Sequence, residues 1–492
     1  MDIIFNYDFS LLFSFSSLAA IVVGTIIGTM VGALPGLGPS VGCALLIPFT
    51  YNMEPIPAVL LLVSLYMSSQ YGGSISSIVL GIPGNPSSVP ALLDGHTLAK
   101  QGFPGKALGY VLYASTTGGF IGALILMVFT IPLMYITIRF SDPELFLVAV
   151  LGLLSIVTLG SEDISKSLVS VTLGLFLTFI GLDVLSGAQR YTFGTVILMD
   201  GIAIVPLLTG LFAISEVLNM VSGDLSHKTV DKWENIKVTL PWKEFKSLFK
   251  LIFKSSIMGT LFGVIPATGA AAASWFAYSH AKRTSKNPDL FGQGSPEGIA
   301  APESANNASV GGSLVPFLTL GIPGSPTIAV IASALMIHGI QPGPHLLSQN
   351  PDLVYSIFWG VLLSVVFMFL VGKYTTTMFA SLMAIPSYIL VTIVFTISII
   401  GAYAARNSIV DVWIALVAGI LGYFMKKLKF SIPAFVLAFV LGRMIERNFR
   451  RSLMISQGSY MIFVTRPFAL LFLIIIVLMI VSTFWGRKKK AA

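Results

Sequence analysis

Twelve stretches of the 492-residue chain are almost purely apolar, and short polar segments separate them. The runs cover about 11–34, 56–69, 107–138, 143–160, 164–181, 194–222, 249–265, 352–371, 376–400, 408–425, 431–442 and 467–486. A helix that crosses the hydrocarbon core of a bilayer needs about 20 such residues. The pattern predicts an all-helical, polytopic membrane protein with about 12 spans, some of them too short to cross upright.

Four further stretches, at 35–51, 71–105, 263–281 and 309–344, are rich in Gly, Pro and Ser. They are too apolar for solvated linkers and too often interrupted for continuous helices. In lipid, the backbone groups that a helix break exposes must find partners within the protein. These stretches therefore predict broken helices or re-entrant hairpins that line an enclosed polar cavity.

The interrupted stretches belong to an internal repeat. The segment Gly28–Gly38 (GTMVGALPGLG) matches Gly259–Gly269 (GTLFGVIPATG) at an offset of 231. Gly72-Gly-Ser74 matches Gly311-Gly-Ser313, and Gly81-Ile-Pro-Gly-Asn-Pro86 matches Gly321-Ile-Pro-Gly-Ser-Pro326, at offsets of 239 and 240. We therefore divide the chain into a first transmembrane repeat (1–222), a basic linker (223–250), a second repeat (251–466) and a C-terminal span with a basic tail (467–492).

Charge predicts the orientation, because Lys and Arg concentrate on the cytoplasmic side of membrane proteins. Six lysines lie between residues 228 and 250, and residues 487–490 read Arg-Lys-Lys-Lys, so the linker and the C-terminus are expected in the cytoplasm. The N-terminus carries Asp2 and Asp8 without a basic residue, so it is expected outside, and its first span shows no cleavable signal pattern. An odd number of crossings in the first repeat would invert the second, with the last span lacking a counterpart.

Composition excludes several classes of protein. Charged residues make up only 10% of the chain and hydrophobic residues 55%, which is too little charge to cover soluble domains of this length. The net charge of +8 is spread over loops and the tail, so it does not indicate nucleic acid binding. The lone Cys43 excludes a disulfide framework and a cysteine-based zinc site.

Paired Gly/Pro breaks in two halves are typical of secondary transporters, in which half-helix N-termini face anionic substrates. No Lys or Arg lies within the paired motifs, so an anion there would be held by backbone N–H groups, hydroxyls and a co-bound cation. The predicted substrate-binding residues are Pro35, Gly36, Gly38, Ser40, Gly73, Ser74, Pro83, Gly84, Asn85, Pro266, Thr268, Gly269, Gly312, Ser313, Pro323, Gly324 and Ser325. Glu303, Asn306 and Asn307 are candidate cation ligands, and the alternative is that they cap the following helix.

Other charged residues receive structural interpretations. Asp183 and Asp200 have Arg190 within reach, which predicts an ion pair, while Asp94 and Glu446 also lie in or beside apolar or Gly-rich stretches. The clusters at 426–429 and 443–451 are interpreted as anchors at the membrane boundary, with docking of a partner subunit as the alternative. Gly24, Gly28 and Gly32 form a stripe of small residues that predicts close helix packing.

The motifs resemble the large permease subunit of the tripartite tricarboxylate transporter family. They include 32–39, 71–75, 93–95, 180–183, 190–194, 263–270, 301–307, 320–324, 337–343 and 441–448, in the family's order. The resemblance implies a bacterial inner-membrane permease that imports di- or tricarboxylates with Na⁺ or H⁺ and needs no other cofactor. It also implies two partners, a small membrane subunit of about four spans and a periplasmic solute-binding protein.

Two alternatives remain at this point. One is a stand-alone ion-coupled carboxylate carrier without a binding protein. The other is an intramembrane serine hydrolase, because Gly38-Pro-Ser40-Val-Gly42 has the Gly-x-Ser-x-Gly pattern and His280 or His338 could serve as its base. The second repeat has Ala271 in the place of Ser40, which argues against a nucleophile, and no ATP-binding or zinc-protease motif occurs. We expect a transporter and not an enzyme.

Overall fold

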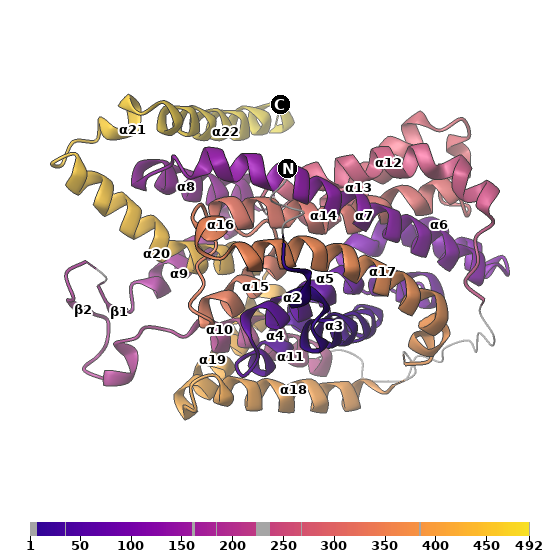
Figure 1. Cartoon of the computed structure of the whole chain (residues 1–492), viewed down its shortest axis with the longest axis horizontal. Helices are drawn as coiled ribbons and strands as arrows, with labels where there is room; N and C mark the ends of the chain where they lie inside the picture. Colours follow the sequence, from indigo (N-terminus) through magenta and orange to yellow (C-terminus); the bar gives the residue numbers. More distant parts are fainter. Residues whose placement is uncertain are drawn as a thin grey trace.

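The computed structural model describes residues 7–34, 36–159, 163–183, 185–222, 237–266, 268–382 and 385–491, and within these segments the fold is helical (Figure 1). The one sheet consists of two antiparallel strands of two residues each, with Gly181 opposite Arg190. The all-helical class predicted from the apolar runs is confirmed. The first half of the predicted basic linker, residues 223–236, lies outside the described residues.

The elements follow one another along the chain as helices of very different lengths. Their bounds are α2 Phe9–Phe13, α3 Phe15–Ala33, α4 Pro39–Thr50, α5 Pro55–Leu80, η1 Pro86–Ser88, α6 Val89–Lys100, α7 Pro104–Thr137, α8 Asp142–Leu159, α9 Ile164–Thr178, β1 Gly181–Leu182, β2 Gln189–Arg190, η2 Val196–Leu198, α10 Ile204–Thr209, η3 Gly210–Ile214, α11 Ser215–Ser222, α12 Trp242–Val264, α13 Gly269–Thr284, η4 Pro288–Leu290, α14 Pro296–Leu320, α15 Pro326–Ile337, α16 Leu346–Gln349, α17 Pro351–Leu382, α18 Ser387–Ala404, α19 Ile409–Lys427, α20 Ile432–Ile455, α21 Ile462–Thr465 and α22 Pro467–Ala491.

Seven helices among the described residues are long and apolar enough to cross a membrane. They are α3, α5, α7, the continuous helix Ile204–Ser222, α12, α17 and α19, and five shorter apolar helices of 10–17 residues accompany them. The chain is therefore a multi-pass membrane protein, as predicted. The expectation of about twelve spans is met only in part, because seven of the described helices reach the required length and hydropathy.

The predicted helix breaks are present in both halves of the chain. The α3–α4 connection spans residues 34–38, and the α12–α13 connection spans residues 265–268. Helix α5 ends at Gly81 with φ +67°, and α14 ends at Gly321 with φ +74°, a conformation that glycine adopts without steric cost. Asn85 then caps η1 and Ser325 caps α15, with backbone φ angles of −146° and −148°. The two halves thus use the same local geometry at matching positions.

Helices α5 and α14 occupy the interior of the molecule. Nearly every residue of both helices is buried, although they are not the most hydrophobic ones. Helix α3 packs against α5, and α12 packs against α14. Glycines make these contacts close: a Cβ atom at Gly259 would lie 2.2 Å from the Ala305 carbonyl oxygen. Small residues allow such backbone approach, which is how helices pack without a hydrophobic driving force in lipid.

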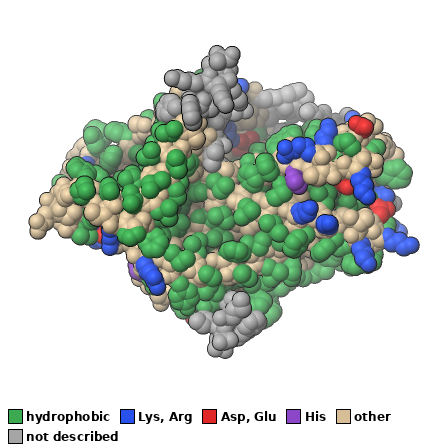
Figure 2. Space-filling view, turned by 90° about the horizontal axis from the view of Figure 1, so that it is seen from above, with side chains coloured by type: hydrophobic (Ala, Val, Ile, Leu, Met, Phe, Trp, Pro, Cys, Tyr) green, Lys and Arg blue, Asp and Glu red, His purple; other side chains and the backbone are tan. Residues whose placement is uncertain are grey.

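The surface separates apolar from charged regions. In Figure 2 hydrophobic side chains cover most of the visible face, and charged side chains gather at one end of the long axis. Figure 1 places α6, α12 and α13 at that end. The start of α12 carries Lys243, Lys246 and Lys250, and the last turn of α13 carries Lys282 and Arg283. Such segregation is expected of a protein whose apolar surface faces lipid.

The glycine stripe of α3 gives a test of this packing. A Cβ atom at Gly28 would lie 2.2 Å from the Ser68 Oγ and 2.4 Å from the Leu65 carbonyl oxygen. We expect Gly28→Ala to destabilise the protein by about 1–3 kcal/mol, since the two backbones must separate. The control is Val23→Ile, which adds one carbon on the exposed side of the same helix. Thermal melting of the detergent-purified protein measures both, and equal melting temperatures would contradict the packing role.

Candidate functional site

All four helix breaks meet at one cavity of about 880 Å³. The α3–α4 break contributes Gly36, Gly38 and Ser40, and the α5–α6 break contributes Pro83, Gly84 and Asn85. From the second half, Thr268 and Gly269 come from the α12–α13 break, and Ser325 comes from the α14–α15 break. Nine of the predicted site residues, separated by up to 289 positions in sequence, therefore line a common space.

Four helices begin at the wall of this cavity. The first residues of α4, η1, α13 and α15 are all among the lining residues. The first turns of these helices contain no acidic side chain. A helix N-terminus carries a partial positive charge and backbone N–H groups without intrahelical partners, so it attracts anions. The convergence of four such ends makes the cavity suited to an anion even though its four breaks contain no Lys or Arg.

Hydrogen bonds join the two halves across the cavity. The hydroxyl groups of Ser40 and Thr327 are 2.9 Å apart, and the Tyr66 hydroxyl donates to the Ser325 Oγ at 3.2 Å. Ser325 at the same time accepts the backbone N–H of Ile328 as the cap of α15. These contacts join the parts of the cavity wall that the two halves contribute.

Asn85 is the amide of the first half's break, and its side chain is fully engaged. Its Oδ1 accepts from the Ser88 backbone N–H at 3.0 Å and from the Ser87 hydroxyl at 2.8 Å. Its Nδ2 donates to the Gln70 Oε1 at 3.3 Å. Asn85 therefore caps a helix that begins at the cavity, and Gln70 links this cap to α5.

Seven predicted site residues lie outside the cavity lining. They are Gly73, Ser74, Pro266, Gly312, Ser313, Pro323 and Gly324, while Pro35 lies outside the described residues. Gly73 backs the first break, since its carbonyl accepts the N–H of Gly84 at 3.2 Å. A Cβ atom at Gly324 would lie 2.7 Å from the Ser313 Cα, and one at Gly312 would lie 2.2 Å from the Thr260 carbonyl oxygen. These small residues let the broken segments pack closely against their neighbours.

The cavity also has lining residues that the motifs did not indicate. Tyr66 and Gln70 come from α5, Phe212 and Glu216 from the helix before the linker, and Lys426, Phe430, Ile432 and Pro433 from α19 and α20. Lys426, which we interpreted as part of a boundary anchor, lies in the cavity wall and pairs with Glu216. The expected absence of basic groups holds for the motifs but not for the cavity. The only indication of Lys426 in the sequence was its position as a charged residue at the end of an apolar run.

A second polar cluster lies behind the cavity, around Glu303. The Glu303 side chain is completely buried and accepts hydrogen bonds from the Ser74 hydroxyl at 2.5 Å and the Ser115 hydroxyl at 3.0 Å. No basic side chain pairs with it among the described residues. An uncompensated charge in this position is costly, so the carboxylate requires a proton or a cation.

Asn306 and Asn307 lie one turn beyond Glu303 on the same helix. Their Nδ2 groups donate to the carbonyl oxygens of Gln70 and Met67 on α5, at 3.4 and 3.1 Å. Their Oδ1 atoms are buried and have no hydrogen-bond partner among the described residues. The helix-capping alternative is wrong, because these residues lie within α14 and Ser295 caps that helix. Two free amide oxygens one turn from a carboxylate are the kind of ligands that hard cations prefer.

Asp94 is buried but fully compensated. Its Oδ1 accepts the backbone N–H groups of Gly292, Gly294 and Ser295 at 2.8, 3.0 and 2.7 Å, and its Oδ2 accepts from the Tyr278 hydroxyl at 3.0 Å. This carboxylate also lies at the N-terminus of α14, where the helix dipole favours it. Asp94 therefore joins the first half to the start of α14 as a structural anchor.

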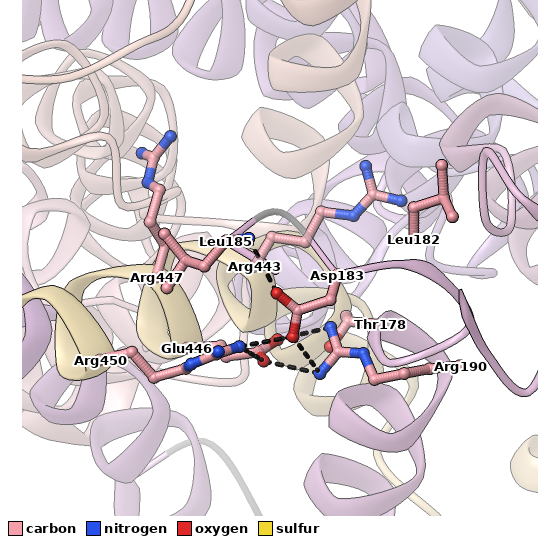
Figure 3. Close-up of a pocket in the computed structure, with 9 residues that line it drawn as sticks. All are labelled: Thr178, Leu182, Asp183, Leu185, Arg190, Arg443, Glu446, Arg447 and Arg450. Carbon is pink, nitrogen blue, oxygen red and sulfur yellow. Dashed lines mark hydrogen bonds and ion pairs between the residues drawn. The ribbon is translucent and has the colours of Figure 1, made fainter. Parts of the chain in front are cut away.

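Asp183 and Glu446 form a ring of ion pairs with Arg190 and Arg450 (Figure 3). Arg450 lies 2.5 Å from the Asp183 Oδ2, and Arg190 lies 3.5 Å from the same atom and 2.7 Å from the Glu446 Oε1. The predicted pair of Asp183 with Arg190 is confirmed. Asp200 makes no ion pair among the described residues, and only its carbonyl accepts from Arg443. The ring attaches the loop that carries β1 and β2 to α20.

The arrangement around Ser40 does not support a serine hydrolase. The Ser40 hydroxyl, at the start of α4, pairs with the Thr327 hydroxyl of α15. His338 lies beside Thr50, at the opposite end of α4. Within the described part of the chain, no group of three or more His, Cys, Asp or Glu side chains is placed to hold a metal ion.

The fold and the cavity define a class, that of polytopic membrane proteins with paired helix breaks around a polar site. Residues 18–437 match the model of the tripartite tricarboxylate transporter TctA family. The chain belongs to this family, and it is a large membrane subunit of a tripartite tricarboxylate transporter, a non-enzymatic permease.

Two curated relatives come from Agrobacterium vitis. The chain is 34% identical over 430 residues to the "uncharacterized 52.8 kDa protein in TAR-I ttuC' 3'region", an alignment that covers 87% of this chain and 85% of the relative. It is 38% identical over 215 residues to the "uncharacterized protein in TAR-II ttuC' 3'region", which covers 43% of this chain and 87% of that relative. No solved structure matches the chain.

The ring around Asp183 predicts a pH dependence. Backbone N–H bonding from Ser186, followed by the Arg450 guanidinium, lowers the pKa of the Asp183 carboxyl from its ordinary value of 3.8. A carboxylate with a lowered folded-state pKa contributes stability above the ordinary value, and this contribution is lost only as the pH falls through the lower folded value. We expect Asp183→Asn to melt a few degrees below the wild type at pH 7.

The melting difference between Asp183→Asn and the wild type should persist to about pH 4 and narrow below it. Asp200→Asn is the matched control, because this carboxylate is not part of the ring. A difference that vanishes already between pH 5 and pH 6 would contradict the lowered pKa.

Proposed function

We propose that this permease imports di- or tricarboxylates by symport with Na⁺ or H⁺. The carrying observation is the convergence of four helix N-termini on one cavity of about 880 Å³. Helix N-termini bind carboxylates through backbone N–H groups and the helix dipole. The hydroxyls of Ser40, Ser325 and Thr327 add neutral donors to the same wall.

The coupling cation would bind at the cluster of Glu303, Asn306 and Asn307. Three features support this location: a fully buried carboxylate without a basic partner, two buried amide oxygens without a hydrogen bond, and two hydroxyls in contact with the carboxylate. A polar path leads from this cluster to the cavity, because Asn306 donates to the Gln70 carbonyl and the Gln70 Oε1 accepts from Asn85 and Ser87. Cation binding would thus affect Asn85, which caps a helix that begins at the cavity.

The rest of the system follows from the family and the charge pattern. We infer a bacterial inner-membrane complex in which a periplasmic solute-binding protein delivers the carboxylate and a small four-span subunit assembles with this chain. The N-terminus would lie in the periplasm and the basic C-terminus in the cytoplasm. The equal geometry of the breaks at Gly81 and Gly321 supports two repeats, and an odd number of crossings in the first would invert the second. Movement of the broken segments against the other helices would give alternating access.

The first experiment measures uptake of labelled citrate and succinate. Cells without their own uptake systems would express this chain together with a small membrane subunit and a secreted binding protein taken from the genes beside its own, where those genes encode them. We expect accumulation that requires all three proteins and that collapses when ionophores dissipate the Na⁺ and H⁺ gradients. Full uptake by this chain alone would favour the stand-alone carrier, and uptake indifferent to both gradients would contradict symport.

The second experiment tests the cation cluster with Glu303→Gln. This variant keeps the shape of the side chain but removes the charge that a cation must balance. We expect gradient-driven citrate uptake to fall at least tenfold, while exchange of internal for external citrate, which moves no net cation, is retained. Glu297→Gln in the first turn of the same helix is the control. Gradient-driven accumulation by Glu303→Gln at the wild-type level would show that the cation binds elsewhere.

A further inference from the structure

One ion pair lies in the wall of the substrate cavity, between Lys426 and Glu216. Lys426 is in the last turn of α19 and Glu216 in the first turn of α11, so the pair joins two helices that border the cavity. Their side chains are 32% and 10% exposed, so Lys426 keeps part of its surface accessible while Glu216 is nearly buried. They are the charged residues among the described lining of this cavity.

The position of Glu216 relates this pair to the helix breaks. Its Oε1 accepts from the Asn219 Nδ2 at 3.3 Å, so the carboxylate has a second partner within its own helix. A Cβ atom at Gly36, in the α3–α4 break, would lie 3.0 Å from the same Oε1. The ion pair is therefore adjacent to one of the four breaks that form the anion site. A lysine ammonium has three N–H donors, so Glu216 does not exhaust its capacity.

We propose that Lys426 binds a second carboxylate of the substrate and that this carboxylate displaces Glu216. In the empty cavity Glu216 neutralises the ammonium group, so the buried pair carries no net charge. A substrate carboxylate that enters takes the place of the Glu216 carboxylate, which retains Asn219 as its partner. The helix N-termini hold one carboxylate of the substrate. Lys426 strengthens the binding only of molecules that have a further carboxylate.

This inference rests on the proposed carboxylate transport and specifies its selectivity. Helix N-termini and hydroxyls recognise any carboxylate, because one anionic group satisfies them. An ammonium group elsewhere in the same cavity discriminates between ligands by their number of carboxylates. Lys426 is then the residue that separates di- and tricarboxylates from monocarboxylates.

The test uses the full-length, detergent-purified chain and three probes: citrate, succinate and acetate. Binding of labelled citrate is measured directly, and binding of succinate and acetate is measured by their competition with it. We expect Lys426→Met to weaken citrate and succinate binding at least tenfold while acetate binding changes less than twofold. Lys427→Met is the matched control, since the neighbouring ammonium lies over the Tyr423 ring at 5.7 Å and does not line the cavity.

Loss of Lys426 alone removes the ionic partner of Glu216 in the empty protein, a cost that the new ion pair between Lys426 and the substrate carboxylate offsets in the wild type. The double variant Lys426→Met with Glu216→Gln removes both charges and avoids this cost, and we expect the same loss of citrate binding from it. Glu216→Gln alone removes the competing carboxylate, so citrate should bind severalfold more tightly. Citrate binding by the double variant at wild-type strength, or unchanged or weaker binding by Glu216→Gln, would overturn the proposal.

The outcomes separate this inference from the proposed function. If wild-type protein binds citrate and Lys426→Met binds it equally well, the selectivity role fails and carboxylate binding stands. If the variant loses acetate and citrate binding to the same degree, Lys426 does not discriminate between ligands by their number of carboxylates, and the inference is also wrong. If the wild-type chain binds none of the three probes and the complete system transports none, the proposed function itself fails.

Discussion

The organisation of this protein depends on one constraint: backbone N–H and C=O groups freed by a helix break cannot remain unpaired in lipid. The breaks must therefore lie inside the protein, where other polar groups satisfy them. This explains why α5 and α14, which carry two of the breaks at their ends, occupy the interior although other helices are more apolar. It also explains why all four breaks meet, since one shared cavity satisfies them together.

Buried charged side chains also need partners within the protein. How completely hydrogen bonds and ion pairs compensate each charge distinguishes structural residues from functional ones. Asp94 has four hydrogen-bond donors and Asp183 has a complete ring of partners, so both are fixed parts of the fold. Glu303 has only two hydroxyls, and the Lys426–Glu216 pair borders open space. These incompletely compensated groups are the ones on which an exchanging cation or anion can act.

Much of the site follows from sequence pattern because the determining property is local. The Gly-Ile-Pro-Gly segments follow the ends of α5 and α14, and Asn85 and Ser325 cap the next helix through their side-chain oxygens. What the sequence did not predict depends on distant partners. The capping alternative placed Asn306 and Asn307 at a helix end, whereas they lie inside α14. The pairing of Lys426 with Glu216 was not foreseen either.

The sequence by itself determined the helical membrane class, the positions of the breaks and the family, because hydropathy and Gly/Pro motifs act over a few residues or one turn. Only the tertiary structure decided that the four breaks share one cavity, and that Gly73 and Gly312 support the wall from behind. It also decided that Lys426 meets Glu216 across 210 positions. The physical reason is that sequence motifs specify where a helix breaks but not which segments lie beside the break, because that depends on how the helices pack.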